Sequence, residues 1–271
     1  MVVLVAGASS GLGLHTARQL AAAGMTVVAG ARSYQECEGE TDGVYRLGLD
    51  VRDPASVWRF VRLAADRYGS PDALVCAQGL LNMNAAAEYR DEDLQDVMDT
   101  NFFGSARLVR QVMPLFLEKK QGKIILFSSV NGLLGIPFQG AYTASKHAIE
   151  GYAECLRMEV QPAGVSVCLV TPGDHRSGQK RYRRRGTSDR PESPYHDRYL
   201  QAVKQIEHDE ANGSDPDRLG RAIARALMKK RLPARLLVAK PDQKLAVVLH
   251  DVLPTSLFSC IISGYYGQKG K

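Results

Sequence analysis

Short apolar runs rich in Val, Ile and Leu alternate along this chain with longer segments whose apolar residues recur at helical spacing. Runs of the first kind predict buried strands, and segments of the second kind predict helices. Strands are expected at residues 2–6, 26–30, 45–49, 73–76, 123–127, 166–170 and 235–238. Helices are expected at residues 12–23, 55–67, 91–118, 141–161 and 217–230. Asp53-Pro54 starts the second of these, with an N-cap followed by proline at the first helical position.

Strands that alternate with helices are typical of an α/β fold, a doubly wound parallel sheet with helices on both faces. The 271 residues, 45% hydrophobic and 24% charged, suit one globular domain. The alternation fails between residues 174 and 215, which are polar and rich in Arg, Gly, Ser and Pro. Such a stretch is too long for a plain connection in a compact domain, so we expect a substrate lid with some local helix.

No apolar run approaches the roughly 20 residues that span a bilayer. The closest run, at 245–262, is interrupted by His250, Asp251 and Pro254. Because the chain opens directly on a strand and a glycine motif, no signal peptide is expected. Its five cysteines are scattered and include no Cys-x-x-Cys pair. This pattern favours reduced thiols in a cytoplasmic protein and argues against a metal site.

The net charge of +6 is concentrated in one basic cluster, Lys180, Arg181, Arg183, Arg184 and Arg185. A solvated loop is the favoured interpretation of this cluster. Nucleic acid is not an expected partner, because no known nucleic-acid-reading module accompanies the charges. If the cluster instead faces a substrate pocket, it would suit a substrate with an anionic end.

A glycine motif lies between the first expected strand and the first expected helix. Small residues let the backbone approach a dinucleotide closely, and a helix N-terminus offers unpaired N–H groups to the pyrophosphate. The position between strand and helix therefore predicts a Rossmann-type, cofactor-binding fold. The residues expected to bind the cofactor here are Gly7, Ser9, Ser10, Gly11, Leu12 and Gly13.

The end of the second strand decides which dinucleotide is preferred. An acidic residue there would favour NAD(H), because it accepts hydrogen bonds from the ribose hydroxyls. This chain has Arg32 and Ser33 instead, and a guanidinium suits a 2′-phosphate. NADP(H) is therefore the predicted cofactor and NAD(H) the alternative. A further interpretation of Arg32, as an ordinary solvated charge at the end of a strand, stays open.

Tyr142 and Lys146 are four positions apart, so in a helix they lie on one face. A phenol is a poor base at neutral pH unless a nearby positive charge favours the phenolate. At a few ångströms' separation the attraction is about 4 kcal/mol, enough to lower the phenol pKa by up to about three units. The pair therefore predicts an acid/base device.

Two further residues have informative sequence spacings from Tyr142. Ser129 lies 13 positions before it, just after an expected strand, and Asn101 lies 41 positions before it. With the glycine motif, these spacings resemble the short-chain dehydrogenase/reductase family over nearly the whole chain. The resemblance implies an oxidoreductase that moves a hydride between a nicotinamide cofactor and a substrate carbinol or carbonyl carbon.

The same resemblance assigns the catalytic roles. Tyr142 would be the acid/base, and Lys146 would bind the nicotinamide ribose and lower the tyrosine pKa. Ser129 would hydrogen-bond the substrate oxygen, and the spacing selects it over the neighbouring Ser128. Asn101, through a kink in its helix, would hold a water that passes protons to Lys146.

Other positions resemble the family's cofactor contacts. Asp50-Val51 resembles the pair that meets the adenine, and Pro172-Gly173 resembles the motif beside the nicotinamide. Cys76-Ala77-Gln78-Gly79 stands where the family has Asn-Asn-Ala-Gly, so Gln78 and Gly79 are expected to keep part of that role. Ser177 stands where the family often has a threonine that contacts the carboxamide. Ala6 replaces a family threonine, which removes a hydrogen bond near the cofactor loop.

Residues 132–151 resemble the family branch that contains 17β-hydroxysteroid and retinol dehydrogenases. This resemblance implies a small hydrophobic substrate that is steroid-, retinoid- or lipid-like. The expected apolar wall of its pocket consists of Leu133, Leu134, Pro137 and Phe138. Residues 253–266 are interpreted as a packed tail, with a pocket border or a subunit contact as alternatives.

The resemblance also implies a homodimer or homotetramer that pairs the helices at 91–118 and 141–161. The alternative function is a non-catalytic dinucleotide-binding sensor or regulator on the same fold, which fold alone could not exclude. The set of Asn101, Ser129, Tyr142 and Lys146 argues against a sensor, because a sensor needs no acid/base residues.

Overall fold

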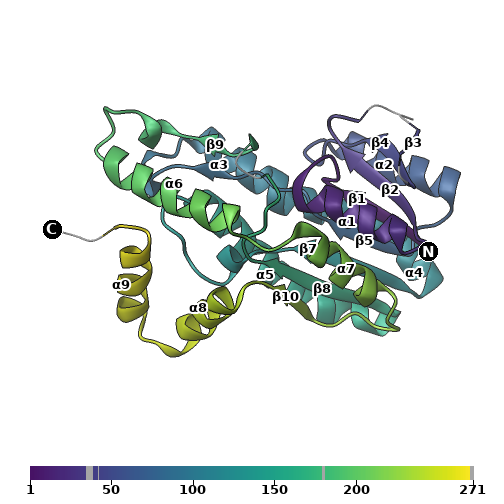
Figure 1. Cartoon of the computed structure of the whole chain (residues 1–271). Helices are drawn as coiled ribbons and strands as arrows, with labels where there is room; N and C mark the ends of the chain where they lie inside the picture. The colour runs from purple at the N-terminus through teal and green to yellow at the C-terminus, as the bar shows by residue number, and fades with distance from the viewer. Residues whose placement is uncertain (35–38, 42, 179–180, 269–271) are drawn as a thin grey trace.

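A parallel β-sheet forms the centre of the protein in the computed structural model, which describes residues 1–34, 39–41, 43–178 and 181–268 (Figure 1). The strands lie in the order β10-β8-β7-β5-β1-β2-β4-β3, and all neighbours are parallel except the two-residue edge strand β3. The seven-stranded parallel sheet predicted from the sequence is thus confirmed. The strands are β1 Val2–Ala6, β2 Thr26–Ala31, β3 Glu40–Thr41, β4 Val44–Gly48, β5 Ala73–Cys76, β7 Gly122–Phe127, β8 Val165–Pro172 and β10 Arg235–Val238.

Helices cover both faces of this sheet (Figure 1). One face packs against α1 (Gly11–Ala22) and α7 (Pro216–Leu227), through a core that includes Leu20 and Ile223. The other face packs against α2 (Pro54–Tyr68), α4 (Gly104–Lys119) and α5 (Gly140–Val160). Most residues of β1, β2, β5, β7 and β8 are buried on both sides, which is why these strands read as mostly apolar runs.

The start of α2 follows the sequence expectation. The Asp53 side chain accepts a hydrogen bond from the backbone N–H of Ala55 at 2.9 Å, and Pro54 occupies the first helical position. This cap pairs one of the N–H groups that have no partner inside the helix.

The single helix expected at 91–118 is two helices joined by a wider turn. The segment consists of α3 (Asp91–Met98), a π-helical turn at Asp99–Phe103 and α4. At Gly104 a Cβ atom would lie 2.7 Å from the Val51 side chain, so α4 packs closely beside the end of β4. The π turn supplies the kink expected near Asn101, and such turns are frequent at functional sites.

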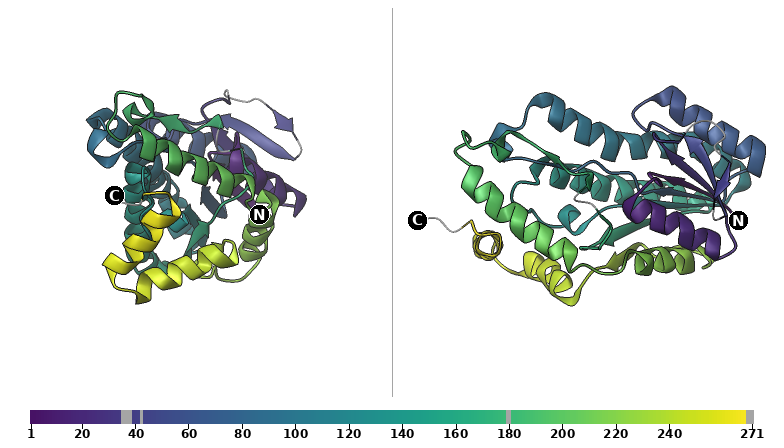
Figure 2. Two further views of the ribbon diagram at one scale, coloured as in Figure 1. Left: turned by 60° about the vertical axis from the view of Figure 1, so that its left-hand side comes forward. Right: turned by 45° about the horizontal axis from the view of Figure 1, so that its top comes forward.

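Three helices lie beyond the carboxyl ends of the strands, where Figures 1 and 2 show them grouped at one end of the sheet. They are α6 (His196–Ala211), α8 (Pro241–Val252) and α9 (Thr255–Tyr265). Before α6 in the chain, β9 (Arg184–Arg185) pairs in parallel with β6 (Asn82–Met83). The sequence pattern predicted only some local helix before residue 215 and no helix after residue 230.

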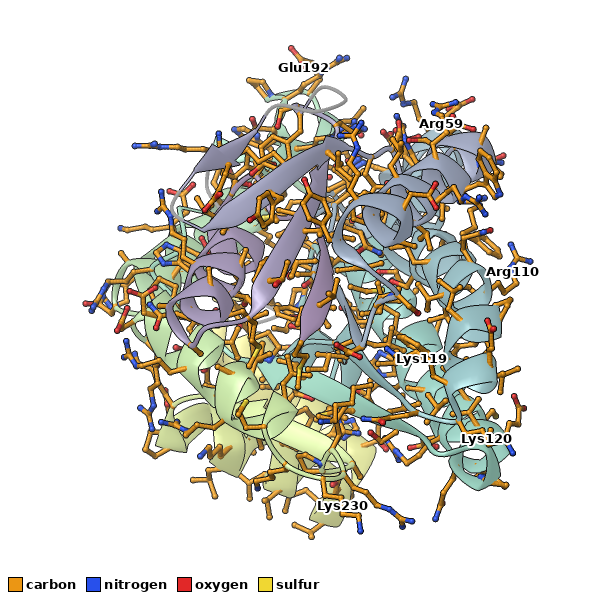
Figure 3. The ribbon with its side chains drawn as sticks, turned by 90° about the vertical axis from the view of Figure 1, so that its right-hand side faces the viewer. Arg59, Arg110, Lys119, Lys120, Glu192 and Lys230 are labelled. Atoms are coloured by element: carbon orange, nitrogen blue, oxygen red, sulfur yellow. The ribbon has the colours of Figure 1, made fainter. Side chains whose placement is uncertain are left out.

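None of the helices in the described ranges is both long and apolar enough to cross a bilayer. Figure 3 shows the side chains of Arg59, Arg110 and Lys230 at the periphery of the molecule, pointing away from the sheet.

Replacing Phe116 with alanine should lower the free energy of unfolding by about 3–5 kcal/mol. The ring is fully buried and packs against Gly122, where a Cβ atom would lie 2.4 Å from its Cγ. Urea unfolding measures the loss. Leu117→Ala is the matched control, because Leu117 is 46% exposed and should change stability little. Equal losses in the two variants would contradict the packing described here.

Candidate active site

The glycine motif lies at the carboxyl end of β1, next to the point where the strand order reverses between β1 and β5. Gly7 has a φ of +78°, and a Cβ atom there would lie 2.5 Å from the backbone of Gln78. A Cβ atom on Gly13 would lie 2.2 Å from the Gly7 carbonyl oxygen. The loop can therefore close over the start of α1 only with glycine at these two positions, which leaves the helix N-terminus open to an anion.

The other expected dinucleotide contacts surround this loop. Ser9 is exposed, Ser10 is the N-cap of α1 without a side-chain cap hydrogen bond, and Leu12 lies in the first turn. The backbone of Ser177 is beside Gly11, with its carbonyl oxygen 3.9 Å from where a Gly11 Cβ would stand. The loop, its hydroxyls and the helix N-terminus thus fit a pyrophosphate.

Arg32 and Ser33 are exposed just after β2. Within the described part of the chain, the Arg32 guanidinium makes no hydrogen bond or ion pair. Burial alone would raise the pKa of Asp50, but hydrogen bonds and charge from Arg52, with a smaller effect of Arg32, hold it below its usual value. The Asp50 carboxylate is already engaged by Arg52, with nitrogen–oxygen distances of 3.1 and 3.3 Å.

Gln78 follows β5, and its side chain turns toward α4. Its Nε2 donates to the Ser105 hydroxyl at 2.8 Å, while its Oε1 is buried with no hydrogen-bond partner. The backbone of Gln78, by contrast, lies against Gly7. Gly79 is next to Asn101, with the amide oxygen 3.9 Å from where a Gly79 Cβ would stand. The side chain of Gln78 thus braces α4, and its backbone meets the glycine loop.

Tyr142 and Lys146 lie one turn apart on α5, as the sequence predicted. The Lys146 ammonium is 5.4 Å from the centre of the Tyr142 ring and donates to the carbonyl of Phe127 at 2.7 Å. Lys146 is 2% exposed, so this carbonyl is the group that compensates the loss of water around its charge.

Burial controls the protonation of this pair. It raises the pKa of Tyr142 to about 12, against a lowering by the hydrogen bond with Ser129, and the carboxylates of Glu210 and Asp174 raise it further. Burial also lowers the pKa of Lys146 to about 8. The sequence predicted that Lys146 would lower the tyrosine pKa. In the folded chain Lys146 is not one of the groups that shift the pKa of Tyr142, and burial, the largest cause, favours the protonated phenol.

Ser129 lies at the end of the loop after β7 and faces Tyr142. Its Oγ accepts a hydrogen bond from the backbone N–H of Asn131 at 3.2 Å and caps a short turn. Ser128 points elsewhere: its hydroxyl oxygen is 2.3 Å from where a Gly132 Cβ would stand, inside the packing between this turn and α5. The geometry places Ser129, and not Ser128, at the site.

Asn101 is fully buried in the π turn. Its Oδ1 accepts from the backbone N–H of Leu80 at 2.7 Å, and its Nδ2 donates to the Leu80 carbonyl at 3.0 Å. The same Nδ2 donates to the Ser145 hydroxyl at 2.9 Å. Asn101 therefore connects the loop after β5 to α5. Its contact on α5 is Ser145, the residue just before Lys146.

A cavity of about 270 Å³ opens beside Ser129 and Tyr142, and Pro172 and Gly173 also line it. Its apolar lining consists of Leu12, Leu81, Val130, Leu134, Ile136, Ile206, Ala246, Ile261 and Ile262. Of the four residues expected to form the apolar wall, Leu134 does so. Phe138 packs edge-on against Tyr199 instead, with ring centres 5.5 Å apart, and neither Leu133 nor Pro137 reaches the cavity.

The carboxy-terminal segment also borders the cavity. Tyr265 and Tyr266 at the end of α9 line it together with Gln243 of α8. The interpretation of residues 253–266 as a packed tail is therefore wrong, and the pocket-border alternative is correct. Hydrophobic periodicity could not reveal this role. It shows that one face of a helix is covered, but it does not show which residues cover that face.

α6 did leave a signal in the sequence, inside the stretch that was expected to be irregular. Tyr199 and Ile206 are both buried and seven positions apart, which is a helical spacing.

In the basic cluster, Arg181, Arg184 and Arg185 are exposed, as expected for a solvated loop, whereas Arg183 is buried, and none of the four lines the cavity. The Arg183 side chain is 1% exposed and ion-paired with Glu210 and Glu207. Arg184 pairs with Asp96 at 2.8 Å, and Arg185 pairs with Glu207 at 3.0 Å. Lys180 lies outside the described residues. Carboxylates of α3 and α6 thus form ion pairs with Arg183, Arg184 and Arg185, because folding brings these distant acids close to the arginines.

Comparison with known proteins identifies relatives along the whole chain. The family model for short chain dehydrogenases matches residues 1–187. A 3-ketodihydrosphingosine reductase of Bacteroides thetaiotaomicron is 35% identical over 265 residues, which cover 98% of this chain and 97% of that protein.

Solved structures share the fold over nearly the same length. A short-chain dehydrogenase from Streptomyces avermitilis superposes with a TM-score of 0.81 and 28% identity, covering 99% of both chains. An actinorhodin polyketide ketoreductase with NADPH superposes with a TM-score of 0.72 and 27% identity, covering 88% of this chain and 95% of that one. These relatives do not single out the hydroxysteroid and retinol branch that residues 132–151 resemble.

Ser129→Ala should lower kcat for NADPH-dependent carbonyl reduction by about 10²–10³-fold, the usual cost of losing one donor to a developing oxyanion. Ser128→Ala is the matched control and should change kcat little, because the Ser128 hydroxyl packs against Gly132 and not against the cavity. The loss of NADPH absorbance, followed by stopped-flow or steady-state kinetics, measures kcat of both variants. A larger loss in Ser128→Ala would place the catalytic register one residue earlier.

Proposed function

Because the chain belongs to the short-chain dehydrogenase/reductase family, whose members interconvert hydroxyl and carbonyl groups with NAD(P), we propose that it reduces a ketone on a lipid-like substrate with NADPH. One observation carries the proposal. The protonated Tyr142, with Ser129 beside it, lies at one end of a largely apolar cavity that continues past Pro172 and Gly173 toward the glycine loop.

In the proposed reaction, the carbonyl oxygen accepts hydrogen bonds from Tyr142 and Ser129. When bound, NADPH supplies the hydride that adds to the carbonyl carbon. Tyr142 gives its phenolic proton to the oxygen as the carbon–oxygen double bond becomes a single bond, and the products are the alcohol and a tyrosinate. Ser129 stabilises the charge on the oxygen during the transfer.

Lys146 then stabilises the tyrosinate and helps to reprotonate it. Its pKa of about 8 allows proton exchange near neutral pH, and its ammonium is held by the Phe127 carbonyl beside the Tyr142 ring. We propose that Asn101, which reaches α5 through Ser145, positions a water that delivers protons to Lys146. The cofactor would be held by the glycine loop, with Asp50 and Val51 at the adenine and Ser177 at the carboxamide.

The preference for NADPH over NADH rests on Arg32. Its guanidinium is exposed at the end of β2, no described carboxylate pairs with it, and Ser33 adds a hydroxyl beside it. A 2′-phosphate would supply the missing anion. The similar ketoreductase structure with NADPH agrees with this assignment.

We propose a substrate with a long alkyl chain in place of a steroid or a retinoid. The 3-ketodihydrosphingosine reductase that resembles this chain over 98% of its length supports a lipid-like ketone. Ile206 of α6 and Ile261 and Ile262 of α9 line the cavity, and such apolar side chains suit an alkyl chain whose ketone meets Tyr142. We further propose that residues 174–215 act as a lid, with α6 moving over the bound substrate.

We also propose that the protein is a homodimer or homotetramer that pairs α4 and α5 with a second copy. Met158 on α5 is 68% exposed and Phe103 just before α4 is 48% exposed, and pairing would remove such apolar side chains from water.

The proposed function is tested by NADPH absorbance loss with 3-ketodihydrosphingosine, a steroid ketone and retinal. We expect turnover to be fastest with the long-chain ketone. Tyr142→Phe should lower kcat/KM by about 10²–10⁴-fold, because it removes the proton donor. Tyr152→Phe is the matched control on the same helix, since Tyr152 packs against Phe102 and away from the cavity. Full activity in Tyr142→Phe would refute the mechanism.

Arg32→Asp should lower kcat/KM with NADPH by about tenfold or more and raise it with NADH, because the new carboxylate repels the 2′-phosphate and accepts ribose hydroxyls. The ratio of the two values is the measurement. Arg225→Asp, an exposed substitution on α7, should leave the ratio unaltered. The assignment fails if Arg32→Asp also leaves it unaltered.

A further inference from the structure

The cavity beside Tyr142 is lined by more negative than positive charge. Among the described residues, four carboxylates line it, those of Asp174, Asp209, Glu210 and Asp242, against one ammonium, that of Lys240. Asp174 follows β8, and Asp209 and Glu210 lie in the last turn of α6. The end of the cavity nearest α6 is therefore acidic, although the chain as a whole carries a net charge of +6.

Two of these carboxylates have only neutral hydrogen-bond donors. Asp174 accepts from Gln243 at 2.6 Å, and Asp209 accepts from Gln205 and from the Tyr265 hydroxyl, both at 2.9 Å. Neither forms an ion pair with any described residue. Glu210 differs, because the buried guanidinium of Arg183 pairs with it. Asp174 and Asp209 therefore carry negative charge that no direct ion pair of the described residues neutralises, and Lys240 offsets only part of the charge of Asp174.

Tyr266 adds a second, independent feature at the same place. Its side chain lines the cavity and is only 9% exposed, and no hydrogen bond of its hydroxyl is formed within the described part of the chain. Burial and then the charges of Asp174 and Asp209 raise the pKa of Tyr266, and all three residues line the same cavity. The Tyr266 hydroxyl is not one of the fully buried polar atoms of the described residues, so it is open to the cavity and available to a bound polar group.

The electrostatics show what kind of group is missing. Burial raises the pKa of Asp174 to about 6, and the charges of Asp209 and Glu210 raise it further, against a lowering by Lys240. A cation bound among these groups would relieve the repulsion, whereas an anion would increase it. The anionic substrate end considered from the basic cluster is thus the wrong sign for this cavity.

We infer that the substrate carries a protonated amine close to its ketone, and that Asp174, Asp209 and the Tyr266 hydroxyl bind this ammonium group while Tyr142 and Ser129 bind the carbonyl oxygen. The inference rests on the proposed ketone reduction and names its substrate class, an amino ketone with a long alkyl chain. An ammonium group has three N–H donors, which matches two carboxylates and one hydroxyl. Asp174, Asp209 and Tyr266 line the same cavity as Tyr142 and Ser129, so one substrate molecule can reach both sets of groups.

The kinetic test compares a saturated long-chain 2-amino-3-ketone with its N-acetyl derivative at pH 7. Acetylation removes the charge and keeps the chain and the carbonyl. We expect kcat/KM to be at least about tenfold higher for the amine, which is the smallest preference expected from one compensated charge. Asp174→Asn and Asp209→Asn should each lower that ratio severalfold. Asp197→Asn, exposed on the same helix α6, should keep it.

Binding gives a readout that does not need turnover. Calorimetric titration of the protein with dodecylamine and with dodecanol, in the presence of NADP⁺, compares a cation with a neutral group on the same chain. We expect dodecylamine to bind at least about tenfold tighter, and Asp174→Asn to reduce this difference. Equal affinities, or an equal ratio in the aspartate variants and the wild type, would overturn the inference.

The two tests separate this inference from the proposed function. If dodecylamine binds tightly and no ketone is reduced, the cation site stands and the proposed ketone reduction fails. If both ketones are reduced at the same kcat/KM and the amine binds no tighter than the alcohol, the proposed reduction stands and the cation site is refuted.

Discussion

The hydrogen bond from the Lys146 ammonium to the Phe127 carbonyl ties α5 to the end of β7. A buried ammonium needs such an acceptor, and this one holds the Lys146 face of α5 against the end of β7, together with the apolar packing of the helix. In this arrangement, the Tyr142 ring lies over Lys146 and faces the loop that carries Ser129. The proton donor, the hydroxyl beside it and the cavity all take their places from this contact between one helix and one strand end.

The π turn in front of α4 supports the same arrangement from the other side. Asn101 is held by both backbone groups of Leu80 and reaches Ser145 on α5. Gln78 joins this set through Ser105, whose hydroxyl also donates to the Asn101 carbonyl. Polar side chains buried in this way are costly unless they are paired, so the network holds α4, α5 and the end of β5 in one geometry.

Charge is distributed differently in space than along the chain. Arg183, Arg184 and Arg185, which are neighbours in sequence, form ion pairs with carboxylates of α3 and α6. The buried Arg183 compensates the charge of Glu210. Asp174, next to the site, comes instead under the influence of acids about 35 positions away, at the end of α6. Carboxylates therefore outnumber ammonium groups in the lining of the cavity, although the net charge of the protein is positive, and this difference underlies the proposed substrate class.

The sequence by itself determined the sheet, the glycine loop and the spacing of Tyr142 and Lys146. These depend on period, on the backbone room of glycine and on one turn of helix, all of which are local properties. Residues 2–6 and 73–76 were predicted to the residue, because buried strands of a parallel sheet are continuous apolar runs.

Tertiary structure alone decided the wall and the charge of the cavity. α9 borders the cavity together with α8, whose Gln243 donates a hydrogen bond to Asp174 across 69 positions. Likewise, the buried charge of Arg183 is compensated by Glu210 of α6, which folding brings next to it. Hydrophobic period shows which side of a helix is covered, but the partner that covers a polar group is chosen through space, by the cost of leaving a buried charge uncompensated.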